Sequence, residues 1–474
     1  MRNKCVQISL FDIYNDISTS MEENKPKLIS LLDDNIDFDS LISYSFHRAF
    51  YSYTGRKHKY HLISFIKSLV LAKLLSLSDT QLITVLKCSS ELRDFCEFDK
   101  IPDASQFTRF KHKFCQHIVE LFESLVEITE PICREINSKK ADYLIYDTTG
   151  IEPLVTENNP KFFNTKLKEA KKLSKNSSYN PYIGVYKNLP DIAAANHSVK
   201  QQYINGHYCY AFKAGILTNG IGIVRHISFF DDAFKEKHSE IVTKKTDNPD
   251  IDKEISDSAS LKPVLSDFFD LHKGFSYKTF IGDSAFDSYD NYTMLKTDFA
   301  FSRACIPLNQ RNSKNTELDF DKFGAPRCPI DKTPFVFLGK SGGKNRSLRF
   351  KWVCHKSIQS GSKRICTCDT PCTSSSYGKC TYTYPDKDFR LYPGIPRNTE
   401  HFNNLYRHRV TIERTINLFK DCFGINNLKT LNTKTIKTEI YLAGITQLLG
   451  VILAKAVQKP ELFKSVRKLM KSVA

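Results

Sequence analysis

The sequence lacks an export signal and a clear membrane-spanning segment. Its start, MRNKCVQISLFDIYND, contains no sustained apolar run, so we expect no signal peptide. The most apolar stretch, residues 440–457, includes Thr446, Gln447 and Lys455 and is barely long enough to cross a bilayer. We therefore expect a buried helix there, no membrane partner, and a cytoplasmic protein.

Acidic residues are scarce relative to basic ones. The chain has 69 Lys and Arg against 52 Asp and Glu, which gives a formal net charge of +17 and a pI near 9.1. This excess favours a polyanionic partner, above all nucleic acid, and the alternative is a generally basic surface. The hydrophobic content of 41% is typical of a globular protein. Because 474 residues exceed one ordinary core, we expect roughly two to four domains.

Apolar periodicity predicts helices in the N-terminal part of the chain. A basic loop, Thr54–His61, precedes a run from Leu62 to Leu74 with helical spacing. Capping patterns at Ser78 and Asp103 open two further helices. We therefore predict a helical domain over residues 1–135.

The last of these helices carries basic residues mostly off its apolar stripe. Several short helices ending in a basic one resemble a helix-turn-helix DNA-binding module. A helical bundle with a solvated basic face accounts for the same pattern, and the two interpretations stay open. On the first of them, the candidate DNA contacts are Arg56, Lys57, Arg109, Lys111 and Lys113.

Short apolar runs with strand character replace the helical pattern near residue 140. One run, residues 141–146, leads to Asp147, and another, residues 277–281, leads to Asp283. Asn219-Gly220 between two further runs predicts a β-hairpin. Apolar periodicity typical of helices returns near residue 398. We predict an α/β core over residues 140–304 and 396–474, interrupted by an insertion over 305–395, with the helix at 440–457 packed on the sheet.

The segment Tyr406–Lys420, YRHRVTIERTINLFK, contains neither Gly nor Pro and is predicted to be a helix. At about 100° per residue, Tyr406, Arg409, Glu413 and Lys420 fall within an arc of roughly 60°, beside an apolar stripe. The helix thus buries one stripe and presents a carboxylate between two cations and a phenol along its edge.

Three carboxylates from separate elements form a candidate catalytic set. Asp147 and Asp283 each follow an apolar run, and Glu413 lies on the late helix. Two-metal phosphoryl chemistry requires such carboxylates, whose hard oxygens suit Mg²⁺ or Mn²⁺. Each residue alone has an ordinary alternative, a turn residue for the two aspartates and a surface ion pair for Glu413. Asp142 and Asp287 compete for the same roles, but they are placed less well after the apolar runs.

At this point the chain resembles the DDE-type insertion-sequence transposases, which have an RNase H-like catalytic core. One branch of that family carries a Tyr-x2-Arg-x3-Glu-x6-Lys helix, which this sequence matches at all four positions. Asp147 in LIYDTTG and Asp283 in FIGDSAFDSY match the family's two aspartates. The stretches KYHLISFIKSLVLAKLL and IPDASQFTRFKHKF are similar to the preceding helical domain, so the resemblance covers about 45–460.

The resemblance implies a fold and a reaction. The fold is a mixed, mainly five-stranded α/β sheet with helices on both faces. The reaction is cleavage at the ends of a mobile element and transfer of the released 3′-hydroxyl to target DNA. Asp147, Asp283 and Glu413 would ligate two Mg²⁺ or Mn²⁺ ions. Arg409 and Lys420 would hold phosphates, and Tyr406 would position the backbone near the scissile bond.

Partners and location also follow from the resemblance. They are double-stranded DNA, as terminal inverted repeats and as target, a homodimer on DNA, and a bacterial, nucleoid-associated cytoplasmic location. Two alternatives remain, an RNase H-like nuclease without strand transfer and a catalytically silent DNA-binding protein. The basic N-terminal domain argues against the first, and the three carboxylates argue against the second.

Cysteines are concentrated in the insertion. With 14 cysteines and no export signal, reduced thiols or metal ligation are favoured over a disulfide framework. The spacing is irregular, with C-x-C-x3-C in place of paired C-x2-C motifs. Structural zinc and ordinary free thiols are therefore both open. In RSLRFKWVC, Arg349 and Lys351 alternate with apolar residues, which predicts a strand that either contacts DNA or is an ordinary exposed strand. The candidate zinc ligands are Cys354, Cys366, Cys368, Cys372 and Cys380.

Overall fold

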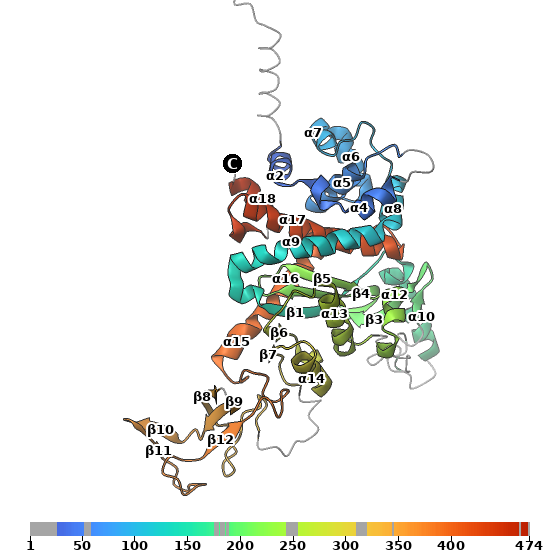
Figure 1. Cartoon of the computed structure of the whole chain (residues 1–474). Coiled ribbons are helices and arrows are strands. Elements are labelled where there is room, and N and C mark those ends of the chain that lie inside the picture. The colour runs from blue at the N-terminus through green and yellow to red at the C-terminus, as the bar shows by residue number, and fades with distance from the viewer. Residues whose placement is uncertain are drawn as a thin grey trace, which may run out of the picture. The chain divides into compact units, whose positions relative to one another are not determined.

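The structure is a computed structural model, and it describes residues 26–51, 58–174, 180, 185, 189–242, 255–309, 320–343, 346–463 and 466–472. The chain divides into two compact units. One, a helical unit, combines Met1–Ile132 with Phe419–Ala474, and the other, an α/β unit, is Cys133–Leu418 (Figure 1). The helical unit therefore draws on both ends of the chain.

Short capped helices build the helical unit. Ser78 closes a full capping box with Gln81, and Asp103 accepts a hydrogen bond from the Gln106 N–H, as the sequence patterns predict. In the described part of this unit the α-helices are α2 (Lys27–Asn35), α3 (Phe38–Leu41), α4 (Tyr44–Phe50), α5 (Leu62–Leu74), α6 (Asp79–Cys88), α7 (Ser90–Phe95), α8 (Ala104–Lys113), α17 (Thr433–Ala456) and α18 (Val466–Ser472). Helix α9 (Cys115–Ala141) runs from this unit into the other.

Helix α17 is the core helix of the helical unit. Among the described residues it is the one single helix that is long and apolar enough to cross a membrane, yet 89% of that apolar window is buried inside the protein. It packs against α5 and α8. The prediction of a buried helix is confirmed. Its packing partners differ from the sheet that the sequence led us to expect, because α17 belongs to the helical unit.

A seven-stranded mixed sheet forms the centre of the α/β unit. Its order is β2-β3-β4-β1-β6-β7, and β5 also pairs with β4. Strand β4 is antiparallel to β1, β3 and β5, whereas β6 is parallel to both β1 and β7. The strands are β1 (Tyr143–Ile151), β2 (Ile192–Ala193), β3 (Asn196–Ile204), β4 (His207–Asn219), β5 (Val224–Phe229), β6 (Thr279–Ile281) and β7 (Arg303–Cys305).

Helices cover the sheet on both faces (Figure 1). Helix α13 (Asp257–Leu271) contacts β1 from one side, where Ser260 bonds the hydroxyl of Tyr146. Helix α16 (Val410–Asn417) contacts β1 and β4. The remaining α-helices among the described residues of the unit are α10 (Pro160–Ser174), α12 (Asp232–Lys237), α14 (Tyr289–Thr297) and α15 (Glu400–Tyr406). The predicted mixed sheet flanked by helices is thus confirmed, with two more strands than expected.

Strand register places the two candidate aspartates at one level. In the parallel pair, Ile145 is opposite Ile281, and two residues further along each chain come Asp147 and Asp283. Strand β1 does not end at Asp147, as the sequence suggested, but continues to Ile151 because β4 pairs with it along its whole second half. Asp283 lies just beyond β6, where its side chain caps a short 3₁₀ turn, Ser284–Phe286.

The predicted helix Tyr406–Lys420 is one helical path with two irregular turns. Helix α15 ends at Tyr406, a 3₁₀ turn covers Arg407–Arg409, α16 follows, and a π turn spans Leu418–Cys422. A 3₁₀ turn is tighter and a π turn wider than an α-helix. The arc calculated for a regular helix is therefore wrong in detail, although the helical assignment holds.

The β4–β5 hairpin docks helix α16. The predicted hairpin is confirmed, and Asn219 Oδ1 organises its turn by accepting hydrogen bonds from the N–H groups of Ile221 and Ile223. Gly222 has φ +91° and lies against α16, where Thr415 Oγ1 donates to the Gly222 carbonyl at 2.8 Å. A side chain at Gly222 would press on Thr411, with a Cβ only 3.3 Å from Thr411 Cγ2.

The insertion has a β-rich core of its own. Its strands form a three-stranded sheet, β12-β9-β8, and a β10-β11 hairpin. Phe350 and Trp352 of β9 are buried in one cluster with Cys328 and Cys354. The strand predicted at RSLRFKWVC is confirmed as β9. The strands are β8 (Val336–Gly343), β9 (Arg346–Val353), β10 (Ser357–Ser360), β11 (Lys363–Cys366) and β12 (Cys380–Thr383).

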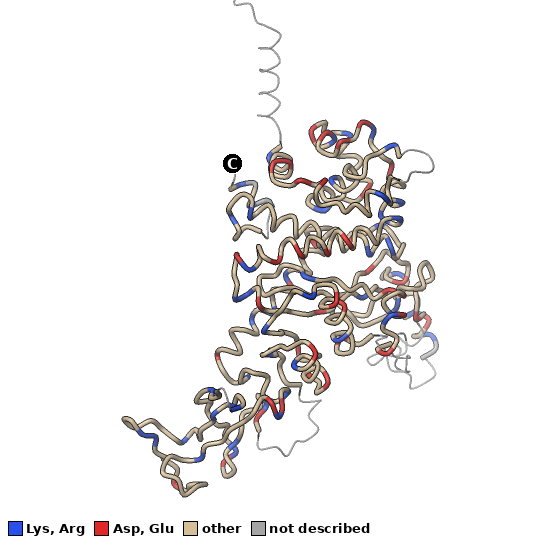
Figure 2. The backbone as a smooth tube through the Cα atoms, in the orientation of Figure 1, with Lys and Arg blue, Asp and Glu red and all other residues tan. Residues whose placement is uncertain are grey.

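The basic excess is spread along the chain. Figure 2 shows Lys and Arg interspersed with Asp and Glu in both units. The domain boundaries predicted from sequence remain a prediction, with one difference to note. The segment 396–474, assigned there to the core, is divided after Leu418 between the two compact units.

Candidate active site

The structure brings Asp147, Asp283 and Glu413 to one place in the α/β unit. The Arg409 guanidinium links two of them, because it pairs with Glu413 one helical turn away and lies 3.9 Å from Asp283 Oδ2. Asp147 interacts electrostatically with both Arg409 and Asp283. The three carboxylates therefore surround a single guanidinium, with Asp147 and Asp283 coming from adjacent parallel strands and Glu413 from α16.

Burial raises the pKa of Asp147 to about 6. Arg409 and the Thr148 N–H act in the opposite direction, whereas the negative charges of Asp283 and Asp257 add to the effect of burial. Burial and two nearby negative charges thus disfavour the ionised form of this carboxylate more than Arg409 favours it. The donor set is made of hard oxygens, so it fits divalent cations such as Mg²⁺ or Mn²⁺, which would stabilise the ionised form.

Tyr406 also belongs to this cluster. Burial raises the pKa of its hydroxyl, Arg409 lowers it, and Asp283 and Glu413 raise it further, which places the ring next to the carboxylates. Lys420 is in the π turn that follows α16, and this residue is part of the helical unit. The structure thus groups five of the six predicted active-site residues, and the sixth, Lys420, belongs to the helical unit.

The two alternative aspartates have different environments. Asp287 is fully buried, and Arg390 donates two hydrogen bonds to it at 3.0 and 2.7 Å. The Asn309 N–H adds a third, at 2.7 Å. Asp142 precedes β1, and its carbonyl accepts hydrogen bonds from the start of β6. Asp287 is thus engaged with Arg390 and Asn309, and the choice of Asp147 and Asp283 as the catalytic pair stays a prediction.

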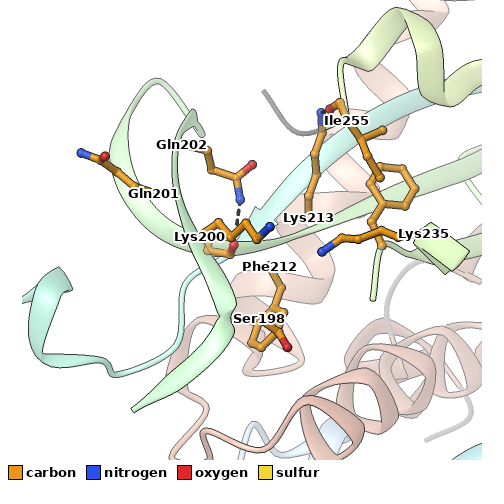
Figure 3. A pocket seen from close by; sticks show the side chains of 10 residues that line it. Ser198, Lys200, Gln201, Gln202, Phe212, Lys213, Lys235 and Ile255 are labelled. Atoms are coloured by element: carbon orange, nitrogen blue, oxygen red, sulfur yellow. Dashed lines mark hydrogen bonds between the residues drawn. The ribbon is translucent and has the colours of Figure 1, made fainter. Parts of the chain in front are cut away.

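Asp257 supports the site and was not identified from the sequence. Its Oδ1 accepts a hydrogen bond from the Thr148 hydroxyl at 2.8 Å and pairs with Lys213 Nζ at 2.5 Å. Lys213 also donates to the Ile255 carbonyl, beside a cavity of about 30 Å³ that Lys200 and Lys235 line (Figure 3). A space of this size holds about one water. The signal available in the sequence was a capped helix start at Ser256, which does not reveal the contact to β1.

The basic residues predicted to contact DNA have unlike surroundings. Arg109 and Lys113 are exposed on α8, whereas Lys111 is only 2% exposed. Lys111 Nζ pairs with Asp79 at 2.8 Å and with Glu439 at 2.5 Å. Its placement on a solvated basic face is therefore wrong, because two carboxylates hold it inside the helical unit. Arg56 and Lys57 lie outside the described residues.

The insertion cysteines form a loose group of thiols. The described cysteines of the chain form no disulfide with one another. Burial raises the pKa of Cys354, and the neighbouring thiols of Cys328, Cys372 and Cys366 raise it further. Cys328, absent from the predicted zinc set, is thus a neighbour of Cys354, and Cys380 on β12 is paired with Val353 on β9. On β9, Lys351 bonds Tyr377 and Arg349 stacks on Tyr382 within the insertion, which agrees with an ordinary exposed strand.

Comparison with known proteins gives a partial match. Residues 18–113 match the family model described as "Transposase domain (DUF772)", so this part of the chain is similar to transposases. No curated protein matches the chain. Among solved structures, the chain is similar to a piggyBac transposase synaptic complex with hairpin DNA, at 10% identity and a TM-score of 0.35, over 96% of this chain and 81% of that one. That likeness is too distant to carry an argument about this protein.

Proposed function

We propose that this protein is a DNA transposase of the DDE type, with an RNase H-like core. The observation that carries the proposal is the meeting of Asp147, Asp283 and Glu413 around Arg409. The transposase-domain match at residues 18–113 supports it from a separate part of the chain. The strand order β5-β4-β1-β6-β7, with only β4 antiparallel to its neighbours, supports the proposed core.

In this proposal, Asp147, Asp283 and Glu413 hold two Mg²⁺ or Mn²⁺ ions. Such ions, when bound, lower the pKa of an attacking water or 3′-hydroxyl and stabilise the leaving oxygen. Arg409 contacts Glu413 and Asp283 and is placed to contact a phosphate that approaches the site. Tyr406 lies next to the carboxylates and would orient the DNA backbone. Lys420 would contribute a further phosphate contact.

The proposed substrate is double-stranded DNA, both as terminal inverted repeats and as target, bound by a homodimer. Arg109 and Lys113 are the exposed candidates for contacts in the helical unit. A structural zinc ion in the insertion stays part of the proposal, with Cys328 added to its candidate ligands because of its place among the thiols. This ion would stabilise the insertion and take no part in the reaction.

The decisive experiment measures cleavage and joining on duplex DNA that carries the inverted repeats flanking the gene. The wild-type protein should nick these ends with Mg²⁺ and join them to a second DNA. Asp147→Asn, Asp283→Asn and Glu413→Gln should each lose both activities while DNA binding persists. Glu400→Gln, an exposed carboxylate on α15, is the matched control.

The outcomes separate the alternatives. Cleavage without joining would identify an RNase H-like nuclease. Tight binding without any Mg²⁺-dependent cleavage would identify a silent DNA-binding protein. Full activity in all three carboxylate variants would remove this cluster as the catalytic site.

A further inference from the structure

A second group of metal-ligand side chains lies at the far end of β1. Glu152 directly follows β1, and His207 and Cys209 lie at the start of β4. One potential ligand atom from each lies within 4.8 Å of the other two, and this is the one group of three His, Cys, Asp or Glu residues with that property in the described part of the chain. Cys209 is buried, Glu152 is half-buried, and His207 is exposed.

Both ring nitrogens of His207 have an oxygen nearby. Nε2 lies 3.1 Å from Glu152 Oε2, and Nδ1 lies 3.4 Å from the Asn205 carbonyl. In the tautomer with its proton on Nδ1, the ring donates to this carbonyl and turns the Nε2 lone pair toward Glu152, as metal ligation requires. A carbonyl that fixes the imidazole tautomer in this way is typical of metal-bound histidines.

The nitrogen–oxygen distance fits a small tetrahedral ion as well as it fits a hydrogen bond. Zinc bonds of about 2.0–2.1 Å to nitrogen and oxygen place two tetrahedral ligand atoms roughly 3.3 Å apart. The observed Nε2–Oε2 separation of 3.1 Å is close to that value. Asn205 Nδ2 donates to Glu152 Oε1 at 2.8 Å, so the carboxylate is already oriented toward the histidine.

A separate observation points to a cation in the adjoining cavity. A cavity of about 280 Å³ is lined by Glu152, His207 and Cys209, and also by Glu157. Glu157 is only 9% exposed. Its Oε1 accepts a hydrogen bond from the Ala194 N–H at 2.9 Å, but its Oε2 is buried and has no hydrogen-bond partner among the described residues. A buried carboxylate oxygen without a hydrogen-bond partner is unusual, and a cation held in this cavity would place positive charge near it.

We propose that Glu152, His207 and Cys209 bind a zinc ion, with the fourth position open to this cavity. A set of one thiolate, one imidazole and one carboxylate suits Zn²⁺, because Mg²⁺ and Ca²⁺ prefer oxygen ligands alone. Binding converts the Cys209 thiol to a thiolate, and its proton passes to solvent. The ion would join the end of β1 to the β3–β4 hairpin and so hold the strand that carries Asp147. This proposal is independent of the reaction proposed above.

Zinc content of the full-length protein tests the proposal. The variants are His207→Asn and Cys209→Ser, and the matched control is His197→Asn, an exposed histidine on neighbouring β3. Each protein is equilibrated with a small molar excess of ZnCl₂, passed through a desalting column and measured by mass spectrometry for bound zinc. Both site variants should hold one equivalent less than the wild type and the control, whatever the insertion cysteines bind. Because His207 is exposed, His207→Asn should keep the wild-type circular dichroism spectrum.

Cobalt substitution gives a second readout. Co²⁺ bound through Cys209 should add a thiolate-to-cobalt absorption band, which Cys209→Ser should reduce and His197→Asn should leave unchanged. Zinc affinity at this site should fall by more than about 100-fold in His207→Asn. Equal zinc content in the wild type and His207→Asn, or a cobalt band unchanged in Cys209→Ser, would overturn the proposal.

Discussion

Two aspartates only four residues apart show how the surroundings of a side chain decide its role. Asp283 caps a short turn beside Arg409 and remains about one-third exposed. Asp287 is fully buried and held by two hydrogen bonds from Arg390. The sequence favoured Asp283 only because it follows an apolar run more closely. The ion pair between Asp287 and Arg390, which lies 103 residues further along the chain, could not be read from the sequence.

Substitution of Asp287 should reduce stability, whereas substitution of Asp283 should reduce DNA cleavage. Asp287→Asn leaves Arg390 buried without its charge partner, so it should lower the free energy of unfolding by about 3–5 kcal/mol. Asp283→Asn should leave stability nearly unchanged and abolish Mg²⁺-dependent DNA cleavage. Urea denaturation and a nicking assay on the same preparations make the comparison. If Asp283→Asn is the less stable variant and retains cleavage, then Asp283 is not the catalytic residue and Asp287 is not the structural one.

Arg409 should matter for catalysis beyond its charge. Arg409→Ala removes the cation that contacts Glu413 and Asp283, and it should lower the cleavage rate by about 100-fold, the order expected for loss of one charged donor at a reacting group. Arg409→Lys should restore only part of the rate, because an ammonium cannot make the two-pronged contacts of a guanidinium. Arg407→Ala, an exposed arginine bonded to Asn404, is the control, and an equal loss there would indicate a general effect of positive charge.

At the scale of elements, the sequence predicted what local pattern controls. Capping residues, the Asn-Gly turn, strand β9 and the two aspartate-bearing strands were all recognised, since each depends on neighbours along the chain. The extension of β1 past Asp147 was not, because pairing with β4 sets it. The 3₁₀ and π turns that flank α16 also escaped prediction, since they depend on how the helix packs.

Gly222 should be required for the position of α16. Its positive φ would strain an alanine by roughly 1–2 kcal/mol, and the added methyl would meet Thr411 as well. Gly222→Ala should therefore reduce both stability and cleavage, since α16 carries Glu413. Gly361→Ala is the control, because Gly361 has φ +58° with nothing within 4 Å of an added Cβ. Thermal unfolding and nicking are measured for both, and equal cleavage in the two variants would contradict the prediction.

At the scale of the whole molecule, the sequence missed how the chain is shared between units. The basic composition predicted a DNA partner, and the three candidate metal-binding carboxylates predicted an α/β core. The helical unit, however, combines residues before 133 with residues after 418. The interactions that join these segments include buried ion pairs between positions more than 300 residues apart, such as Lys111 with Glu439. No periodicity or spacing in the sequence carries that information.

Glu439 should contribute strongly to the contact between the N-terminal and C-terminal segments of the helical unit. Lys73 and Lys111 each lie 2.5 Å from its carboxylate inside the helical unit. Burial alone would raise the pKa of Glu439, but the two lysines lower it to about 2. Glu439→Gln leaves both ammonium groups buried without this partner. It should therefore lower the free energy of unfolding by about 3–5 kcal/mol at pH 7.

The effect of Glu439→Gln should depend on pH in a defined direction. Because the folded pKa is depressed, the stabilisation is present in full above the ordinary pKa of 4.5 and is lost as pH falls toward about 2. The difference in unfolding free energy between wild type and Glu439→Gln should thus shrink over that interval, as followed by urea denaturation with circular dichroism. Glu461→Gln, an exposed residue of the same C-terminal segment, should show almost no difference at any pH. A Glu439→Gln difference that stays constant from pH 7 to pH 2 would mean that the carboxylate charge is not what holds these segments together.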